Sequence, residues 1–182
     1  MTRLRTQVVG EIARLRDVVD SLLSFSRSPR IELGLADLSA LIATARELLS
    51  DLIADRGATV TVEAPPELPV RCDGHKIQGV LVNLLKNAVE AATAITIRAR
   101  VEGAEVVLEI ADDGPGLSPE VHEHLFEPFF TTKPNGTGLG LATCLRYVEA
   151  HGGQVEALEA PGQGGALFRV RLPGAVVRGA DR

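Results

Sequence analysis

The amino-acid sequence predicts an α+β protein in which helices are layered on antiparallel strands. Apolar residues recur at helical spacing over residues 37–54, 73–92 and 139–150. Short stretches with alternating apolar and polar residues separate and follow these helices, which is the pattern of strands with one buried face. Strands that follow one another across short turns favour antiparallel pairing. One globular unit of packed layers follows from these patterns.

Residues 1–29 predict a separate helix that precedes this unit. Leu15 and Leu22 are seven residues apart, and Phe25 extends the same apolar stripe. Pro29 cannot continue a helix, so the helix should end near Arg27. A stripe with so little sequence before it cannot form its own core. We therefore expect it to pack on the following domain or on another chain.

The globular unit is expected over residues 30–175, with a tail at 176–182. Asp37 can cap the first of its helices, and Gly152-Gly153 provides a left-handed stop after the last one. A short helical segment is expected near 119–125. Strands are expected at 31–35, 59–63, 70–72, 94–101, 105–111, 154–159 and 166–172.

Composition restricts the classes of protein to consider. The 182 residues are 45% hydrophobic and 24% charged, which is typical of a globular chain. The net charge of -5 argues against a nucleic-acid partner, which would require clustered Lys and Arg. No apolar stretch approaches the ~18 residues of a membrane span, so this segment is expected to be cytoplasmic, although a longer parent chain could be membrane-anchored. Cys72 and Cys144 have no metal-ligand spacing and are interpreted as buried thiols.

Two polar motifs lie on predicted regular elements. Asn83 and Asn87 are four residues apart, so both amides project from one helical face, although surface asparagine pairs are also common. Asp112 follows a predicted strand and precedes Gly114 and Gly116. A carboxylate at a strand end can accept a hydrogen bond from an exocyclic amine, and the glycines allow close approach of a planar ligand. A plain turn would have the same sequence.

Two further motifs lie in the loop-rich region that follows. Residues 126–133 hold three of the five phenylalanines, which we expect to fasten the loop to a core, together with hydroxyls and a cation that could meet phosphate oxygens. Residues 136–141 place glycines at a predicted helix N-terminus, where bare N–H groups and the helix dipole attract an anion. Their spacing matches neither the Rossmann fingerprint nor the Walker loop.

In this order, the four motifs resemble the N, G1, F and G2 boxes of bacterial sensor histidine kinases of two-component systems. The resemblance spans most of the chain and implies the Bergerat (GHKL) fold, a sandwich of a mixed sheet and helices. The short loop between residues 126–133 and Gly136 is similar to the nitrogen-regulation type of sensor kinase. Residues 1–29 resemble the second helix of the dimerisation and phosphotransfer module.

The resemblance implies ATP and Mg²⁺ as cofactors and assigns roles by position. Asn87 would bind Mg²⁺ with Asn83 beside it, and Asp112 would bind the adenine amine in a pocket shaped by glycines. A lid over residues 118–135 would close on the nucleotide. The implied ATP-binding residues are Asn83, Asn87, Asp112, Gly114, Gly116, Thr131, Thr132, Lys133, Gly136, Thr137, Gly138, Leu139, Gly140 and Leu141.

No catalytic side chain is identifiable, because the phosphoacceptor histidine of the family is absent. The four histidines, His75, His122, His124 and His151, lie inside the globular unit and outside any acceptor motif. His122 and His124 offer too few ligands for a metal site by themselves. We infer that the chain begins after the acceptor helix and phosphorylates a histidine outside itself.

The ATPase branches of this fold carry a glutamate at the position of Asn83, where it activates water. An amide lacks that basicity, which favours phosphotransfer over hydrolysis. The expected partners are ATP, the acceptor-histidine helix of the parent kinase, a response regulator and a second copy bound through the N-terminal helix. Two alternatives are a nucleotide-sensing dimerisation module without phosphotransfer and an anti-sigma-like serine kinase.

Overall fold

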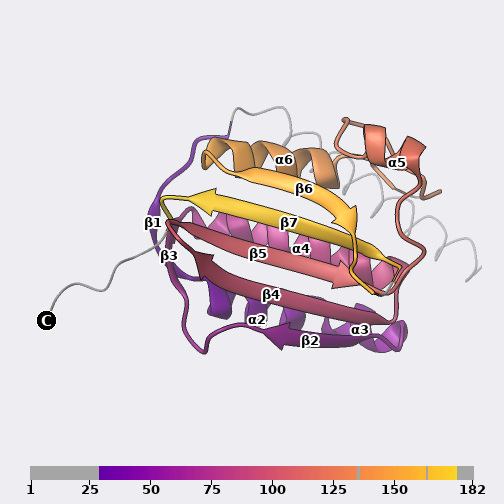
Figure 1. Ribbon diagram of the computed structural model, residues 1–182, viewed down its shortest axis with the longest axis horizontal. Helices are drawn as coiled ribbons and strands as arrows, with labels where there is room; N and C mark the ends of the chain where they lie inside the picture. Colours follow the sequence, from indigo (N-terminus) through magenta and orange to yellow (C-terminus); the bar gives the residue numbers. More distant parts are fainter. Residues whose placement is uncertain (1–28, 135, 163, 176–182) are drawn as a thin grey trace, which may run out of the picture.

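The computed structural model describes residues 29–134, 136–162 and 164–175, so the predicted N-terminal helix and the tail lie outside the described residues (Figure 1). The helices are α2 (Leu38–Leu48), α3 (Ser50–Asp55), α4 (Gly74–Ala91), α5 (Pro119–His124) and α6 (Gly140–Ala150). The strands are β1 (Gly34–Asp37), β2 (Thr59–Glu63), β3 (Pro69–Cys72), β4 (Ala94–Glu102), β5 (Glu105–Asp112), β6 (Gln154–Glu159) and β7 (Ala166–Pro173).

Five strands form one mixed sheet in the order β2-β4-β5-β7-β6. β2 and β4 are parallel, and the other neighbours are antiparallel. Helices α2, α4 and α6 cover one face of this sheet (Figure 1), and β1 pairs with β3 in a small separate sheet. The core lies between the layers, where Leu84 and Leu85 of α4 and Ile97 and Ile110 of the sheet have no exposed surface. The predicted α+β class is confirmed.

Most predicted elements are present, and two of them differ in their bounds. Asp37 caps α2 as expected, since its Oδ1 accepts the N–H of Ser39 at 3.0 Å. The helix expected over residues 37–54 is interrupted at Leu49, whose backbone leaves helical geometry (φ −105, ψ 10). Leu48, whose spacing places it with the apolar residues of this predicted helix, is 64% exposed. The first strand lies at Gly34–Asp37 and not at 31–35, because it pairs there with β3.

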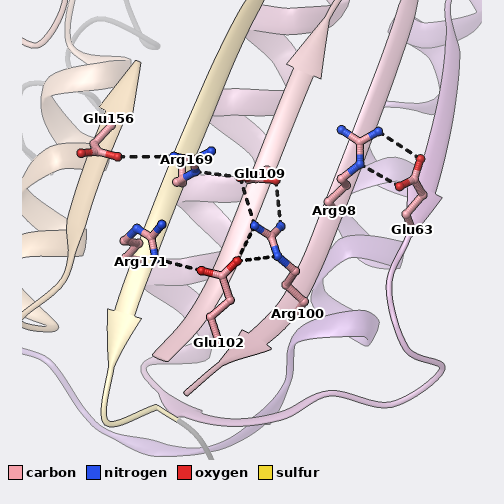
Figure 2. Close-up of polar contacts among 8 residues, drawn as sticks. All are labelled: Glu63, Arg98, Arg100, Glu102, Glu109, Glu156, Arg169 and Arg171. Atoms are coloured by element: carbon pink, nitrogen blue, oxygen red, sulfur yellow. Dashed lines mark hydrogen bonds and ion pairs between the residues drawn. The ribbon is translucent and has the colours of Figure 1, made fainter. Parts of the chain in front are cut away.

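Alternating charges cover the open face of the sheet (Figure 2). One row crosses all five strands through Glu63, Arg98, Glu109, Arg169 and Glu156. Glu109 is only 6% exposed and accepts hydrogen bonds from Arg100 at 2.8 Å and Arg169 at 2.7 Å. The hydrogen bond from Arg100, helped by that from Arg169, holds the pKa of Glu109 below its usual value against the opposing effect of burial.

Glu109→Gln should therefore weaken the sheet in a pH-dependent way. The lowered pKa means that ionised Glu109 stabilises the fold above its unfolded pKa, and that this contribution is lost as the pH falls through the folded value. We expect the free energy of unfolding to fall by about 1.5–3 kcal/mol at neutral pH. The difference from the wild type should shrink under acid conditions in urea titrations repeated across the pH range.

Glu63→Gln is the matched control, because Glu63 also pairs with an arginine but its side chain is 52% exposed. It should cost less than about 1 kcal/mol. Equal losses in the two variants, or a loss in Glu109→Gln that is the same at every pH, would contradict the role given to burial of the Glu109 carboxylate.

Candidate functional site

The predicted motifs meet at one end of the sheet, where β5 ends, α6 begins and the last turns of α4 lie (right side of Figure 1). Asn83 and Asn87 come from α4, and Asp112 is the last residue of β5. Gly140 opens α6. A methyl group placed on Gly140 would lie 3.5 Å from the Asn83 Oδ1 atom, so the first turn of α6 borders that amide.

Asp112 is the buried carboxylate of this region, with 3% of its surface exposed. Its Oδ1 accepts the N–H of Gly114 at 2.9 Å and the N–H of Ala166 at 3.2 Å. Both of the hydrogen bonds that the carboxylate accepts from the described residues end on Oδ1. Oδ2 can therefore accept a hydrogen bond from a ligand.

The neighbouring Asp113 has a different, structural role. It is exposed, and its Oδ1 accepts the N–H of Ala94 at 2.8 Å and the N–H of Thr93 at 2.9 Å. These hydrogen bonds, that from Ala94 first, hold the pKa of Asp113 below its usual value. Asp113 thus fastens the start of β4 to the end of β5, while Asp112 faces inward.

Glycines around Asp112 are required by close backbone contacts. Gly116 has φ +72, and a Cβ there would lie 2.9 Å from the carbonyl oxygen of Gly164. A Cβ on Gly165 would lie 1.9 Å from the carbonyl oxygen of Asp112. The turn before β7 therefore packs directly on the end of β5. Gly164 and Gly165 were missed from the sequence, and only the Gly-Gly pair before the last strand could have indicated them.

A hydrogen bond between two backbone groups joins the ends of the loop before α6. Gly138 has φ +66, and its carbonyl accepts the N–H of Phe129 at 2.9 Å. The Thr137 hydroxyl accepts the N–H of Leu139 at 3.3 Å, but no side chain caps α6. The first N–H groups of α6 are thus available to an anion, as predicted from the glycines. Gly136 packs against Thr131, whose hydroxyl accepts the N–H of Lys133 at 3.1 Å.

The leucines and threonines of the predicted set differ in accessibility. Leu139 is 1% exposed, so it can serve a ligand only through its backbone, whereas Leu141 is partly buried and packs against the core. Thr131 and Thr132 are exposed. Phe126 packs on the core as expected. Phe129 does not, because it is 62% exposed and has a positive φ of 70, so the expectation that all three phenylalanines anchor the loop is wrong.

Lys133 reaches back from this loop to α4. Its Nζ donates a hydrogen bond to the Asn87 Oδ1 atom at 2.8 Å and forms an ion pair with Glu90. The amide oxygen predicted to bind a metal is therefore already in contact with a cation. Glu90 was not among the predicted residues, because a glutamate on a helix usually marks a solvated face.

Among the described residues, no three or more His, Cys, Asp or Glu side chains are grouped so as to hold a metal ion. His122 donates through Nε2 to the carbonyl of Ala157 at 2.8 Å, and His124 is hydrogen-bonded to Glu127 at 3.0 Å. The residues present nevertheless fit Mg²⁺ bound chiefly by phosphates. That ion prefers oxygen ligands and commonly takes only one or two from a protein, and Asn87 offers one.

His151 has a structural position at the end of α6. Its Nε2 accepts the N–H of Asp73 at 2.9 Å, so Nδ1 donates to the carbonyl of Tyr147 at 2.7 Å. The ring lines a cavity of about 270 Å³ near the C-terminal end of β7, which none of the predicted nucleotide-binding residues lines. Both cysteines are buried, as expected, and burial raises the pKa of Cys72 to about 11 and that of Cys144 to about 12.

A family model described as "Histidine kinase-, DNA gyrase B-, and HSP90-like ATPase" matches residues 72–176, which is more than half of the chain. The chain therefore belongs to this family. Its nearer relatives are sensor kinases. It is 39% identical over 176 residues to the sensor histidine kinase ZraS of Klebsiella oxytoca, covering 94% of this chain and 38% of that protein. It is 36% identical over 174 residues to the nitrogen regulation protein NtrY of Azorhizobium caulinodans, covering 90% and 22%.

Solved structures agree with these sequence matches. Full-length ShkA in complex with AMPPNP superposes with a TM-score of 0.83 at 27% identity, over 98% of this chain and 40% of that one. The catalytic domain of histidine kinase ThkA superposes with a TM-score of 0.73 at 31% identity, over 79% and 96%. The resemblance to sensor histidine kinases, inferred from the four motifs, is confirmed. The chain spans well under half the length of the curated relatives above.

Gly165→Ala tests the packing of the last turn on Asp112. Because the added Cβ would overlap the Asp112 carbonyl, the turn must move and the hydrogen bond from Ala166 should lengthen. We expect a loss of about 1–3 kcal/mol in the free energy of unfolding. Gly34→Ala, where nothing lies within 4 Å of the added Cβ, is the control and should be nearly neutral. Equal stability of the two variants in thermal melts would contradict this packing.

Proposed function

We propose that this chain is the ATP-binding catalytic region of a sensor histidine kinase, which transfers the γ-phosphate of ATP to a histidine outside the chain. The observation that carries the proposal is that the buried Asp112 carboxylate and the uncapped N-terminus of α6 lie at the same end of the sheet. One group suits a purine amine and the other suits phosphate. The named relatives are kinases, and ShkA was solved with an ATP analogue.

In this proposal, Asp112 selects adenine. Its Oδ2 accepts a hydrogen bond from the exocyclic amine, while Oδ1 is held by the backbone. Gly114 lets the backbone approach the held oxygen, since a Cβ on Gly114 would lie 2.9 Å from the Asp112 Oδ1 atom, and Gly114 and Gly116 would shape the pocket for the base. A guanine would present a carbonyl oxygen at the same position, and two acceptors would face each other.

The phosphates would lie between α4 and α6. The N–H groups that open α6 and the ammonium of Lys133 supply positive charge, and Asn87 would supply a protein oxygen to Mg²⁺. Mg²⁺ neutralises charge that develops during transfer. Such a site needs few reactive side chains, because positioning and electrostatics account for most of the catalysis in phosphoryl transfer.

Asn83 supports transfer over hydrolysis. It lies beside the first turn of α6, where the ATPase branches of the family carry a glutamate that activates water. Because an amide cannot take a proton from water at neutral pH, the γ-phosphate is retained for a protein acceptor. The acceptor would be a histidine of the dimerisation hairpin, and a response regulator would then receive the phosphate. ThkA was solved in complex with its response regulator TrrA.

No helix of the described part of the chain is long and apolar enough to cross a membrane. Pairing of two copies through residues 1–28 is part of the proposal, and it would place the catalytic region beside the acceptor helices. In a Leu15→Cys variant, a cross-link between the two copies at this position would detect such a pair.

The proposal is tested by supplying a purified acceptor-helix hairpin and labelled ATP. We expect acid-labile label on histidine, and we expect Asn87→Ala to abolish the transfer while leaving the thermal melt unchanged, because the half-buried amide contributes a ligand and little core volume. Nucleotide binding without transfer would indicate a sensing module, and acid-stable label would indicate a serine kinase. Either result would contradict the proposal.

Asp112→Asn tests the role of the carboxylate in selecting adenine. The amide can keep the oxygen that accepts from Gly114 and Ala166, but it places an NH₂ group where a purine amine would donate. We expect ATP affinity to fall by about 10- to 100-fold, which corresponds to the loss of a charged hydrogen bond. GTP affinity should not fall, because the new NH₂ can donate to the guanine carbonyl. Calorimetry that shows an equal loss for ATP and GTP would contradict the assignment.

A further inference from the structure

The last turns of α4 carry a cation-binding pair of oxygens, of which only that of Asn87 belongs to the predicted motifs. Asn87 and Glu90 are three residues apart and share one face of the helix. The Nζ of Lys133 contacts both side chains, donating to the Asn87 amide at 2.8 Å and pairing with the Glu90 carboxylate. The Glu90 side chain is 22% exposed and that of Lys133 is 44% exposed. The lysine of the loop is thus held on α4 by one neutral and one charged oxygen.

Glu90 is the charged member of this pair, and its position matters for a polyphosphate ligand. A carboxylate one turn from Asn87 would repel phosphate oxygens if it had no partner. Lys133 neutralises it, and Lys86 lies 4.0 Å from its other oxygen. Withdrawal of Lys133 toward a nucleotide would therefore expose the charge of Glu90 unless another cation took its place.

We propose that Glu90 is a positioning residue that holds Lys133 against the Asn87 oxygen that would bind a metal. When the nucleotide binds, Lys133 leaves this position and a divalent cation takes its place. The inference rests on the proposed nucleotide site. Mg²⁺ coordinates oxygen at about 2.1 Å, and its repulsion of an ammonium on the same oxygen disfavours simultaneous binding. Metal entry therefore releases Lys133 to the phosphates and leaves a cation near Glu90.

The exchange couples metal binding to nucleotide binding. In the wild type, ATP without metal must draw Lys133 away from Glu90 and leave the carboxylate with only the more distant Lys86. In Glu90→Gln the amide keeps the shape but not the charge, so Lys133 is available from the start. Metal-free ATP should then bind more tightly, and Mg²⁺ should add less.

Calorimetry with ATP in EDTA and in Mg²⁺ tests this coupling. We expect the ratio of the two Kd values to fall by about fivefold or more in Glu90→Gln. Glu63→Gln removes the same charge on the open face of the sheet, away from the site, and should leave the ratio unchanged. In a Lys133→Met background only the repulsion by Glu90 remains, so Glu90→Gln should alter the ratio clearly less than it does when Lys133 is present.

An unchanged ratio in Glu90→Gln would overturn the inference, and so would an effect of Glu90→Gln that is equally large without Lys133, since repulsion alone would then explain it. In both cases wild-type ATP binding would still support the proposed function. Absence of any adenine-nucleotide binding by the folded wild type would instead reject the proposed function itself.

Hydrogen exchange on the nucleotide-free protein gives a readout that needs no ligand. The N–H of Gly136 donates to the carbonyl of Lys133 at 3.0 Å, so its protection reports the order of the turn that carries Lys133, which contact of the side chain with α4 should increase. We expect severalfold faster exchange of this amide in both Glu90→Gln and Lys133→Met, and no change in Glu63→Gln. Wild-type exchange rates in Glu90→Gln would contradict the proposal that Glu90 holds Lys133 on α4.

Discussion

Burial of the Asp112 carboxylate is the constraint from which the geometry of the site follows. A carboxylate that is 3% exposed needs hydrogen-bond donors, and here two backbone N–H groups provide them to one oxygen. Those donors come from segments 52 residues apart in sequence, Gly114 and Ala166. They can approach only because Gly114 and Gly165 lack a Cβ. One buried charge thereby fixes the end of β5, the start of β7 and the room beside them.

The candidate site has residues on rigid elements and one cation, Lys133, on a loop, which is the cation that leaves its position in the proposed exchange. Asp112 and Asn87 stand on β5 and α4, which pack against each other and belong to the layer held by the core and by the charged rows of the open sheet face. Lys133 comes from a loop whose side chains at this point are exposed. A binding site requires rigid groups to orient a ligand, but a cation that must follow the phosphates is better carried by a loop.

The sequence predicted what depends on local periodicity. The α4 pattern, the Asp37 cap and the Gly152-Gly153 stop all follow from neighbouring residues, and each is present. The break at Leu49 could not be predicted, because the apolar spacing continues across it. Contacts between distant segments were missed for a related reason. Gly165 matters because it packs on Asp112, and Glu90 matters because it pairs with Lys133. Nothing in the local sequence of Gly165 or Glu90 identifies the distant residue that it contacts.

The balance of charge in the site also bears on the fate of the terminal phosphate. On its α4 side the candidate site has two neutral amides, Asn83 and Asn87, and one carboxylate, Glu90, which pairs with Lys133. A general base must be free to accept a proton, and in the proposed exchange a cation stays near Glu90 whether or not the nucleotide is bound. Neither the amides nor Glu90 would therefore activate water efficiently. In the proposed function such a site would hold the triphosphate without hydrolysing it, until a nucleophile from another part of the protein receives the phosphate.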